Sequence, residues 1–385
     1  MARALALAAR GLYTTDPNPR VGCVLVRDGV TLGEGWHERA GEAHAEVAAL
    51  RAASAGVDGA TAYVTLEPCS HTGRTPPCAD ALIAAGIRRT VCSTADPNPK
   101  VAGAGIARLR AARIAVSVGA LAGEARALNP GYFSRFERGR PLIRLKLAMS
   151  LDARTAPPRS EGQSGRIWIS GEASRADVQS WRARSSAVLT GAGTVRADNP
   201  RLDVRLAYGP WVRQPLRVVL DPALSCAPSA QIFKDGGALV FAAPDAPHRP
   251  DAPHRPDAPH RPAAPHRPDA PHRPAAPIGV ERVPAVGRAL DLKAVVERLS
   301  ARGVNELWVE CGPRLAASFL DARLVDELIL YVAPVLLGAD AAPLTALCAS
   351  GSNSPLPRFE FESLQRTGAD VRLILRPHVS TPEGS

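Results

Sequence analysis

Four residues between positions 44 and 78 have the side chains that a catalytic zinc site needs. His44 precedes Glu46 by two residues, and Cys69 and Cys78 follow, each directly after a proline. Imidazole and thiolate groups bind Zn²⁺, and three protein ligands leave a fourth tetrahedral position open, as in catalytic rather than structural zinc sites. A water at that position ionises near neutral pH. We predict that His44, Cys69 and Cys78 bind one Zn²⁺ per chain and that Glu46 transfers protons.

The spacing of the two cysteines narrows the class of reaction. A His-x-Glu motif followed by Pro-Cys matches the signature of zinc deaminases, in which the second cysteine usually comes after two further residues. Here eight residues, 70–77, separate Cys69 from Cys78. This longer segment contains His71 and Arg74, and the guanidinium of an arginine matches the geometry of a phosphate group. The alternative interpretation of the set is a stabilising zinc or buried cysteines.

Composition argues against several classes of protein. The 385 residues carry a formal net charge of +10, but aromatic residues make up only 4% of the chain, so the mixture of basic and aromatic residues typical of nucleic-acid binding is missing. The seven cysteines are an odd, scattered set, which argues against disulfides and favours a reducing cytoplasm. No apolar run approaches the ~20 residues of a membrane span. We expect no nucleic-acid partner and no membrane segment.

The first half of the sequence is expected to alternate helices and strands. We predict helices at 1–10, 44–53, 78–85 and 106–112, and strands at 21–26, 30–36, 60–66, 89–94 and 114–118. His44 and Glu46 would then lie in the first turn of the second helix. This alternation predicts one sheet covered on both faces.

A second α/β domain is expected from residue 141 onward. We predict strands at 142–148, 186–190, 216–220, 238–242, 306–310, 328–332 and 371–375, and helices at 173–183, 292–302 and 315–320. The strand at 142–148 is expected to alternate between apolar and polar positions. The glycine-containing turn at 311–314 lies between a strand and a helix, where backbone amides can hold a phosphate.

A proline-rich insertion interrupts this second domain. The six-residue unit Asp-Ala-Pro-His-Arg-Pro repeats from 245 to 274, with alanine in place of aspartate at 263, and the insertion extends to 277. Proline at every third position removes hydrogen-bond donors and favours a solvated polyproline II conformation. Such a segment cannot build a core, so we expect a loop expansion. Adventitious metal binding by the regularly spaced histidines of the repeat is the alternative. The role of the repeat is left open.

Beyond these features, the chain resembles the RibD family of bifunctional riboflavin biosynthesis proteins over nearly its whole length except the repeat. The resemblance is carried in the first half by 44–46 (His-Ala-Glu), 65–71 (Thr-Leu-Glu-Pro-Cys-Ser-His), 73–78 (Gly-Arg-Thr-Pro-Pro-Cys) and 96–99 (Asp-Pro-Asn-Pro), and in the second by 147–152 (Leu-Ala-Met-Ser-Leu-Asp), 168–170 (Trp-Ile-Ser), 191–200 (Gly-Ala-Gly-Thr-Val-Arg-Ala-Asp-Asn-Pro) and 309–313 (Val-Glu-Cys-Gly-Pro). It implies a cytidine-deaminase-like α/β/α domain at 1–140, followed by a dihydrofolate-reductase-like α/β domain at 141–385.

The resemblance also implies two reactions on a small phosphorylated pyrimidine. The first is zinc-dependent hydrolytic deamination of 2,5-diamino-6-(5-phosphoribosylamino)pyrimidin-4(3H)-one. The second is NADPH-dependent reduction of the ribosyl group to ribityl, which gives 5-amino-6-(5-phosphoribitylamino)uracil. By position, the deaminase substrate would be held by Asn18, His37, His71, Arg74, Asp96 and Asn98.

In the second domain the resemblance assigns a cofactor site and a substrate site. The cofactor would contact Ala148, Trp168, Thr194, Asp198 and Gly312, and the reductase substrate would contact Arg166, Arg182, Arg205 and Glu310. Three residues depart from the family pattern, because Arg166 stands in place of a serine, Ala153 in place of a glycine and Cys311 in place of a small residue. The resemblance further implies a homo-oligomer.

Three other functions are weighed against this interpretation. A deaminase acting on tRNA would be expected to have two residues between its cysteines and a basic tail, and this sequence has neither. A second alternative is that only the deaminase half is active. A third is a zinc-stabilised interaction module with a proline-rich arm, in which Glu46 would have no chemical role.

Overall fold

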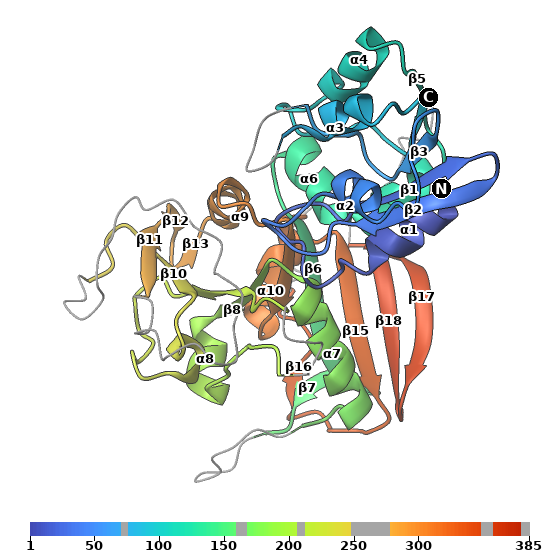
Figure 1. The fold of residues 1–385 in the computed structure, drawn as a ribbon. Coiled ribbons are helices and arrows are strands. Elements are labelled where there is room, and N and C mark those ends of the chain that lie inside the picture. The colour runs from blue at the N-terminus through green and yellow to red at the C-terminus, as the bar shows by residue number, and fades with distance from the viewer. Residues whose placement is uncertain (71–75, 159–167, 206–211, 248–277, 348–356, 379–385) are drawn as a thin grey trace, which may run out of the picture. The chain divides into compact units, whose positions relative to one another are not determined.

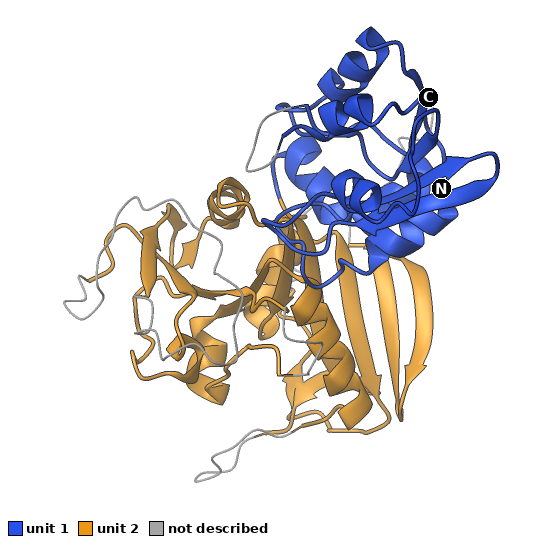
Figure 2. Cartoon of the chain, viewed as in Figure 1, with its two compact units in different colours: residues 1–140 blue, residues 141–385 orange. Residues whose placement is uncertain are grey.

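The computed structural model describes residues 1–70, 76–158, 168–205, 212–247, 278–347 and 357–378. The chain divides into two units, Met1–Arg140 and Pro141–Ser385, which Figure 2 shows in different colours. No helix among the described residues is long and apolar enough to cross a membrane.

Unit 1 is built on a five-stranded sheet in the order β2-β1-β3-β4-β5 (Figure 1). The strands are β1 (Gly22–Arg27), β2 (Val30–Trp36), β3 (Thr61–Val64), β4 (Arg89–Cys92) and β5 (Ala115–Val118). β1 pairs antiparallel with β2 and with β3, whereas β3, β4 and β5 are parallel to one another. All five strands expected from the sequence are present.

Helices cover both faces of this sheet. They are α1 (Ala2–Ala9), α2 (Ala45–Arg51), α3 (Cys78–Ala84), α4 (Ala104–Ala111), α5 (Ala122–Leu128) and α6 (Pro130–Arg138). A Cβ on Gly22 would lie 2.0 Å from the carbonyl oxygen of Ala4 in α1, and one on Gly35 would lie 2.3 Å from the amide of Ala49 in α2. Gly35 pairs with Cys23, the neighbour of Gly22 along β1, so α1 and α2 lie on opposite faces of the sheet. Glycine allows both helices to approach the strands closely.

Two helices of unit 1 were missed by the sequence analysis, which predicted nothing between 119 and 139. α5 and α6 occupy this segment, and α6 carries recognisable boundary signals. Pro130 is its first residue, and Gly139 follows its end with a φ of 69°. Proline at the start and glycine just past the end are the common asymmetry of helix termini.

Unit 2 contains a nine-stranded sheet in the order β11-β10-β9-β8-β14-β6-β15-β18-β17. Its strands are β6 (Leu142–Ser150), β8 (Ala187–Gly191), β9 (Leu216–Leu220), β10 (Ala238–Ala242), β11 (Gly279–Arg282), β14 (Glu306–Glu310), β15 (Glu327–Ala333), β17 (Phe359–Thr367) and β18 (Asp370–Pro377). In this spatial order, the strands β11, β10, β9, β8, β14, β6 and β15 are parallel to one another. β18 pairs antiparallel with β15, and β17 pairs antiparallel with β18 at the edge of the sheet. Figure 1 shows β15, β18 and β17 side by side.

Apolar clusters lie on both faces of this larger sheet. α9 (Leu292–Ala301) and α10 (Pro313–Asp321) contribute Val295 and Phe319 to one cluster, and α7 (Glu172–Arg184) and α8 (Ala192–Asp198) contribute Val178 and Val195 to the other. Shorter elements complete the unit: β7 (Arg154–Ala156) pairs with β16 (Ala342–Pro343), β12 (Ala285–Val286) pairs with β13 (Ala289–Leu290), and residues Gln231–Phe233 form a 3₁₀ turn.

The expected alternation along 142–148 is present, because Ile143, Leu145 and Leu147 belong to one apolar cluster whereas Arg144 and Lys146 lie on the opposite face of the strand. Residues Leu142 to Leu145 are all buried, because β6 lies between β14 and β15 near the middle of the sheet. A central parallel strand is covered on both faces, so the charged Arg144 is buried too, and it is paired there with Glu306 and Glu327. The sequence analysis also missed α8, β11 and β17.

The proline-rich insertion lies between two neighbouring strands. β10 ends at Ala242 and β11 begins at Gly279, and the two strands pair in parallel, with Leu239 opposite Gly279. Residues 248–277, which contain most of the repeat, lie outside the described residues. The prediction of a polyproline II loop therefore stays a prediction.

Candidate active sites

The three expected zinc ligands lie together in unit 1. His44 is the N-cap residue of α2, Cys69 follows β3, and Cys78 is the first residue of α3. The Nδ1 atom of His44 lies 3.6 Å from Sγ of Cys69 and 3.3 Å from Sγ of Cys78, and all three atoms lie within 4.8 Å of one another. Ordinary Zn–S and Zn–N bond lengths in a tetrahedron place such atoms about 3.6 Å apart. The geometry fits a zinc ion.

The thiol groups are also prepared for a cation. A hydrogen bond from Cys78, followed in importance by one from His44, lowers the pKa of the Cys69 thiol below its usual range. The pKa of Cys78 is raised in turn, because the two sulfurs share one proton. A thiolate is the form that binds metals, so the lowered pKa of Cys69 favours metal binding at that residue.

Glu46 lies beside the ligands and is 3% exposed. It sits in the first turn of α2, as expected, whereas His44 precedes the helix instead of lying within its first turn. Burial, with a smaller contribution from the charge of Cys69, raises the pKa of Glu46 to about 7. A carboxyl group with a pKa near neutrality can both hold and release a proton.

His37 packs against the ligand His44 from the end of β2. Their rings are nearly perpendicular, with centroids 5.3 Å apart. Burial lowers the pKa of His37, which favours the neutral imidazole. Its Nδ1 lies 3.0 Å from the carbonyl oxygen of Ala43 and its Nε2 lies 3.1 Å from Nδ2 of Asn18, so Nδ1–H donates to the carbonyl and Nε2 accepts from the amide. The structure thus brings two expected substrate residues together.

Asp96 and Asn98 follow β4 and are held by their own contacts. Oδ1 of Asp96 accepts hydrogen bonds from the amide of Asn98 at 2.8 Å and from the hydroxyl of Tyr132 at 2.9 Å. Tyr132 lies on α6, and the sequence analysis did not single it out. His71 and Arg74 lie outside the described residues, so their predicted roles stay predictions.

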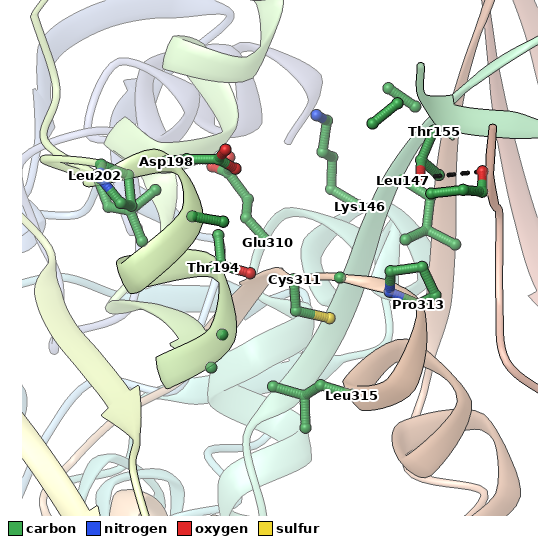
Figure 3. A pocket seen from close by; sticks show the side chains of 18 of the residues that line it. Lys146, Leu147, Thr155, Thr194, Asp198, Leu202, Glu310, Cys311, Pro313 and Leu315 are labelled. Carbon is green, nitrogen blue, oxygen red and sulfur yellow. Dashed lines mark hydrogen bonds between the residues drawn. The ribbon is translucent and has the colours of Figure 1, made fainter. Parts of the chain in front are cut away.

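Unit 2 contains a cavity of about 1410 Å³ at the carboxyl ends of its parallel strands (Figure 3). In open α/β sheets this edge is where ligands bind. Eight residues expected from the resemblance line it, namely Ala148, Trp168, Thr194, Asp198 and Gly312 from the cofactor set and Arg182, Arg205 and Glu310 from the substrate set. Arg166 lies outside the described residues.

The polar centre of this cavity is an ion pair between Arg182 and Glu310. Nε and Nη2 of Arg182 donate to the two carboxylate oxygens at 2.5 and 2.8 Å, and Nε1 of Trp308 donates to the same carboxylate at 2.8 Å. Burial alone would raise the pKa of Glu310, but the charge and hydrogen bonds of Arg182, together with the charge of Lys146 and the hydrogen bond from Trp308, outweigh it and lower the pKa to about 2. Glu310 is therefore ionised, and Arg182 fixes its orientation.

Lys146 is a cavity residue that the sequence analysis missed. It lies on β6, its side chain lines the cavity in Figure 3, and its Nζ atom lies 5.9 Å from the centroid of the Tyr331 ring. Burial lowers its pKa, although the charge of Glu310 opposes this effect. Its position two residues before Ala148 on a strand, and hence on the same face, was the available signal.

Two of the three departures from the family pattern now have a structural setting. Ala153 has a φ of 57°, a left-handed conformation that glycine adopts without strain, which accounts for the glycine usual at that position. Cys311 lines the cavity beside Gly312, the N-cap residue of α10. Burial raises the pKa of its thiol to about 12, so it remains neutral.

Comparison with known proteins agrees with both sites. Residues 1–94 match the cytidine and deoxycytidylate deaminase zinc-binding region, and residues 141–373 match the RibD C-terminal domain. The riboflavin biosynthesis protein RibD of Escherichia coli K12 is 46% identical, with 97% of this chain and 98% of that protein covered. The chain belongs to the RibD family. RibD of Haemophilus influenzae is 41% identical over 98% of this chain and 96% of that protein.

Solved structures of the RibD family show the same architecture. Acinetobacter baumannii RibD, form 1, superposes with a TM-score of 0.83 at 39% identity, covering 98% of each chain. A diaminohydroxyphosphoribosylaminopyrimidine deaminase/5-amino-6-(5-phosphoribosylamino)uracil reductase from Thermotoga maritima gives a TM-score of 0.79 at 30% identity, covering 98% of this chain and 97% of that one. The expected fold, a deaminase-like region followed by a reductase-like region, is confirmed.

The family assignment settles the general activity. The chain is a bifunctional enzyme of riboflavin biosynthesis with a zinc-dependent deaminase and a reductase that uses a nicotinamide cofactor, and its substrate is a small pyrimidine. The alternatives of a tRNA deaminase and of a chain with only deaminase activity are not favoured.

Proposed function

We propose that residues 1–140 deaminate 2,5-diamino-6-(5-phosphoribosylamino)pyrimidin-4(3H)-one and that residues 141–385 then use NADPH to reduce its ribosyl group. The product would be 5-amino-6-(5-phosphoribitylamino)uracil. The observation that carries this proposal is the presence of two candidate sites in one chain, a triad of possible zinc ligands beside Glu46 and a large cavity around an ionised Glu310. The Thermotoga protein named for both reactions supports the choice of substrate.

In the deaminase, His44, Cys69 and Cys78 would hold one zinc per chain. Zinc in such a site activates water for attack on the ring carbon that carries the amino group. The carboxyl of Glu46 is within the same buried space and would carry the proton to the departing amine. The pKa of Glu46, which lies near neutral pH, supports this role, because the carboxyl group must both take up and give up a proton.

The deaminase substrate would be positioned by residues on two sides of the metal. Asn18 and neutral His37 form one hydrogen-bonded pair, and Asp96 with Asn98 forms a second. We assign these four residues to the base and the ribose, and His71 and Arg74 to the ribose and phosphate. Arginine supports the latter assignment through its bidentate fit to phosphate.

In the reductase, Ala148, Trp168, Thr194, Asp198 and Gly312 would contact NADPH, which supplies a hydride to the ribose in its open imine form. Gly312 is the N-cap residue of α10, where free backbone amides can hold a phosphate. Arg166, Arg182, Arg205 and Glu310 would contact the substrate. The ionised Glu310 can accept hydrogen bonds from sugar hydroxyls, and Arg182 keeps it in place.

We further propose a cytoplasmic homo-oligomer. The cysteines of the described residues are all free, which suits a reducing compartment. The oligomer rests on the family resemblance alone.

One experiment tests the two halves separately. The purified chain is given the diaminopyrimidine phosphate with NADPH, with NADH or with neither, while ammonia and cofactor oxidation are followed independently. We expect ammonia in all three cases and cofactor oxidation only with NADPH. Ammonia release without any NADPH oxidation would remove the reductase assignment, and equal oxidation of NADH would remove the NADPH preference.

Matched variants assign each activity to its unit. Glu46→Gln should stop ammonia release while oxidation of NADPH continues when the aminouracil intermediate is supplied. Glu310→Gln should stop the oxidation of NADPH while ammonia release continues. Loss of both activities in either variant would contradict the assignment of one reaction to each unit.

A further inference from the structure

Glu67 is a buried carboxylate close to the zinc ligands that has no part in the functions assigned above. It follows β3 and precedes the ligand Cys69 by two residues. Its side chain is almost completely buried, with the residue 4% exposed. A buried carboxylate is costly unless it is fully hydrogen-bonded.

The carboxylate of Glu67 accepts four backbone hydrogen bonds. Oε1 accepts from the amides of Gly105 and Ile106 at 2.9 and 3.1 Å. Oε2 accepts from the amides of Gly103 and Asp96 at 2.9 and 3.1 Å. All four donors belong to the segment between β4 and the first turn of α4, so this one carboxylate is hydrogen-bonded to the segment at several points along its length.

Part of this set is a helix cap supplied from outside the helix. Gly103, the N-cap residue of α4, has no side chain to accept the amides of the first turn, and Glu67 accepts those of the second and third helical residues instead. A Cβ on Gly105 would lie 1.9 Å from the carbonyl oxygen of Pro68. Glycine at 105 is therefore what allows α4 to come this close to the chain that leads to Cys69.

The fourth hydrogen bond links Glu67 to the substrate side of the site. It holds the backbone of Asp96, whose side chain accepts from Tyr132 and from the amide of Asn98. The backbone of Glu67 adds a further link, because its amide donates to the carbonyl oxygen of Thr94 at 3.0 Å. Asp96 is thus fixed from one side by Glu67 and from the other by Tyr132.

We propose that Glu67 is a positioning residue that sets the distance between the metal ligand Cys69 and the substrate-binding segment Asp96–Asn98. The inference rests on the proposed deaminase function. The carboxylate of Glu67 has as its hydrogen-bond partners backbone amides of the segment between β4 and the first turn of α4. Its effect passes through the backbone of Asp96, so its loss should weaken substrate binding while the zinc ligands remain in place.

The test is Glu67→Gln in the full-length chain. The amide keeps the size of the side chain, but its nitrogen is a donor and would face two backbone donors. We expect KM for deamination to rise about tenfold, the loss of roughly one charge-assisted hydrogen bond, with a much smaller change in kcat. Zinc content should stay near that of the unchanged chain, and NADPH oxidation with the aminouracil intermediate should be unaffected.

A double-variant cycle shows whether the effect passes through Asp96. If it does, Glu67→Gln combined with Asp96→Asn should have a KM no higher than Asp96→Asn alone. Multiplied effects would overturn the proposal. So would an unchanged KM in Glu67→Gln, and so would loss of zinc, which would show that Glu67 acts on the metal ligands instead.

Two further variants exclude a general effect of stability. Asp291→Asn removes a carboxylate that caps α9 in unit 2 through the amides of Lys293 and Ala294, and it should leave KM for deamination unchanged. If Glu67→Gln yields no folded protein, Glu67→Asp keeps the charge with a shorter reach and should still raise KM, and unchanged constants in that variant would overturn the proposal. Absence of ammonia release by the unmodified chain would instead refute the proposed deaminase function.

Discussion

Replacing Arg182 with leucine tests the buried ion pair of the reductase cavity. The variant removes the partner that donates to both carboxylate oxygens of Glu310. We expect the free energy of unfolding at pH 7 to fall by about 3 kcal/mol. Removing one partner of a buried ion pair typically costs ~3–5 kcal/mol. A shift of the Glu310 pKa from 4.5 to about 2 corresponds to about 3 kcal/mol as well.

The pH dependence of this difference gives the sharper test. Because the folded pKa of Glu310 lies below its unfolded value, its contribution is fully present above the ordinary pKa of 4.5 and is lost as the pH falls through about 2. In the variant the buried carboxylate lacks its main counter-charge and becomes a cost whenever it is ionised. The difference in stability between the two proteins should therefore shrink progressively as the pH falls from about 5 to about 2.

Urea unfolding followed by tryptophan emission measures this effect. Trp308 donates to Glu310 and stacks on Trp181 with ring centroids 5.5 Å apart, so emission reports on the altered region. Arg126→Leu is the matched control, since Arg126 makes a bidentate but exposed pair with Glu137 in unit 1 and should cost under ~1 kcal/mol. A difference for Arg182→Leu that is below 1 kcal/mol, or that does not change with pH, would refute the argument.

Three further outcomes are expected. Glu46→Gln should abolish ammonia release with about one zinc per chain still bound. Chelation of the metal should stop ammonia release, but NADPH oxidation should continue when the aminouracil intermediate is supplied. Ammonia release by the variant would contradict the role of Glu46, and a purified chain without zinc would contradict the metal site. Lys146→Met should lower kcat/KM for the reduction by at least about tenfold, because the cavity loses a cation that can donate a hydrogen bond to the substrate. The control Lys234→Met, at an exposed lysine, should leave kcat/KM unchanged. Equal effects of the two substitutions would argue against a role of Lys146 in the reduction. Deleting 251–274 leaves twelve residues, 243–250 and 275–278, between β10 and β11. This is about the minimum for a crossover between parallel strands, so both activities should persist. A large fall in Tm would contradict the interpretation of the insertion as a loop without a core.

The clustering of the three candidate zinc ligands was predictable because they are rare residue types in a fixed local order. His44, Cys69 and Cys78 are identifiable without knowledge of the fold, since zinc limits which side chains can surround it. The reductase cavity was harder to predict, because its residues come from helices, strands and loops that are distant in sequence. Arg182 and Glu310 are 128 positions apart, and only the family resemblance brought them together before the structure was known.

The residues that were missed act through contacts with the backbone or with other side chains. Glu67 was recognised only as part of a motif, because its four partners are amides between positions 96 and 106 and an amide has no signature in the sequence. Tyr132 lies on α6, a helix that was not predicted. β17 was missed because it is an edge strand with exposed side chains, including Phe361 and Leu364, and so lacks the apolar run used to find the other strands.

The central place of β6 has a consequence for synthesis of the chain on the ribosome. β6 follows directly after unit 1, but its two neighbours in the sheet, β14 and β15, begin only at Glu306 and Glu327. Unit 1 can therefore complete its sheet early, whereas both edges of β6 stay unpaired until β14 and β15 have been translated. Such edges promote aggregation. In cells, the fraction of chains with an active reductase should thus depend on chaperones and on the rate of elongation much more than the fraction with an active deaminase does.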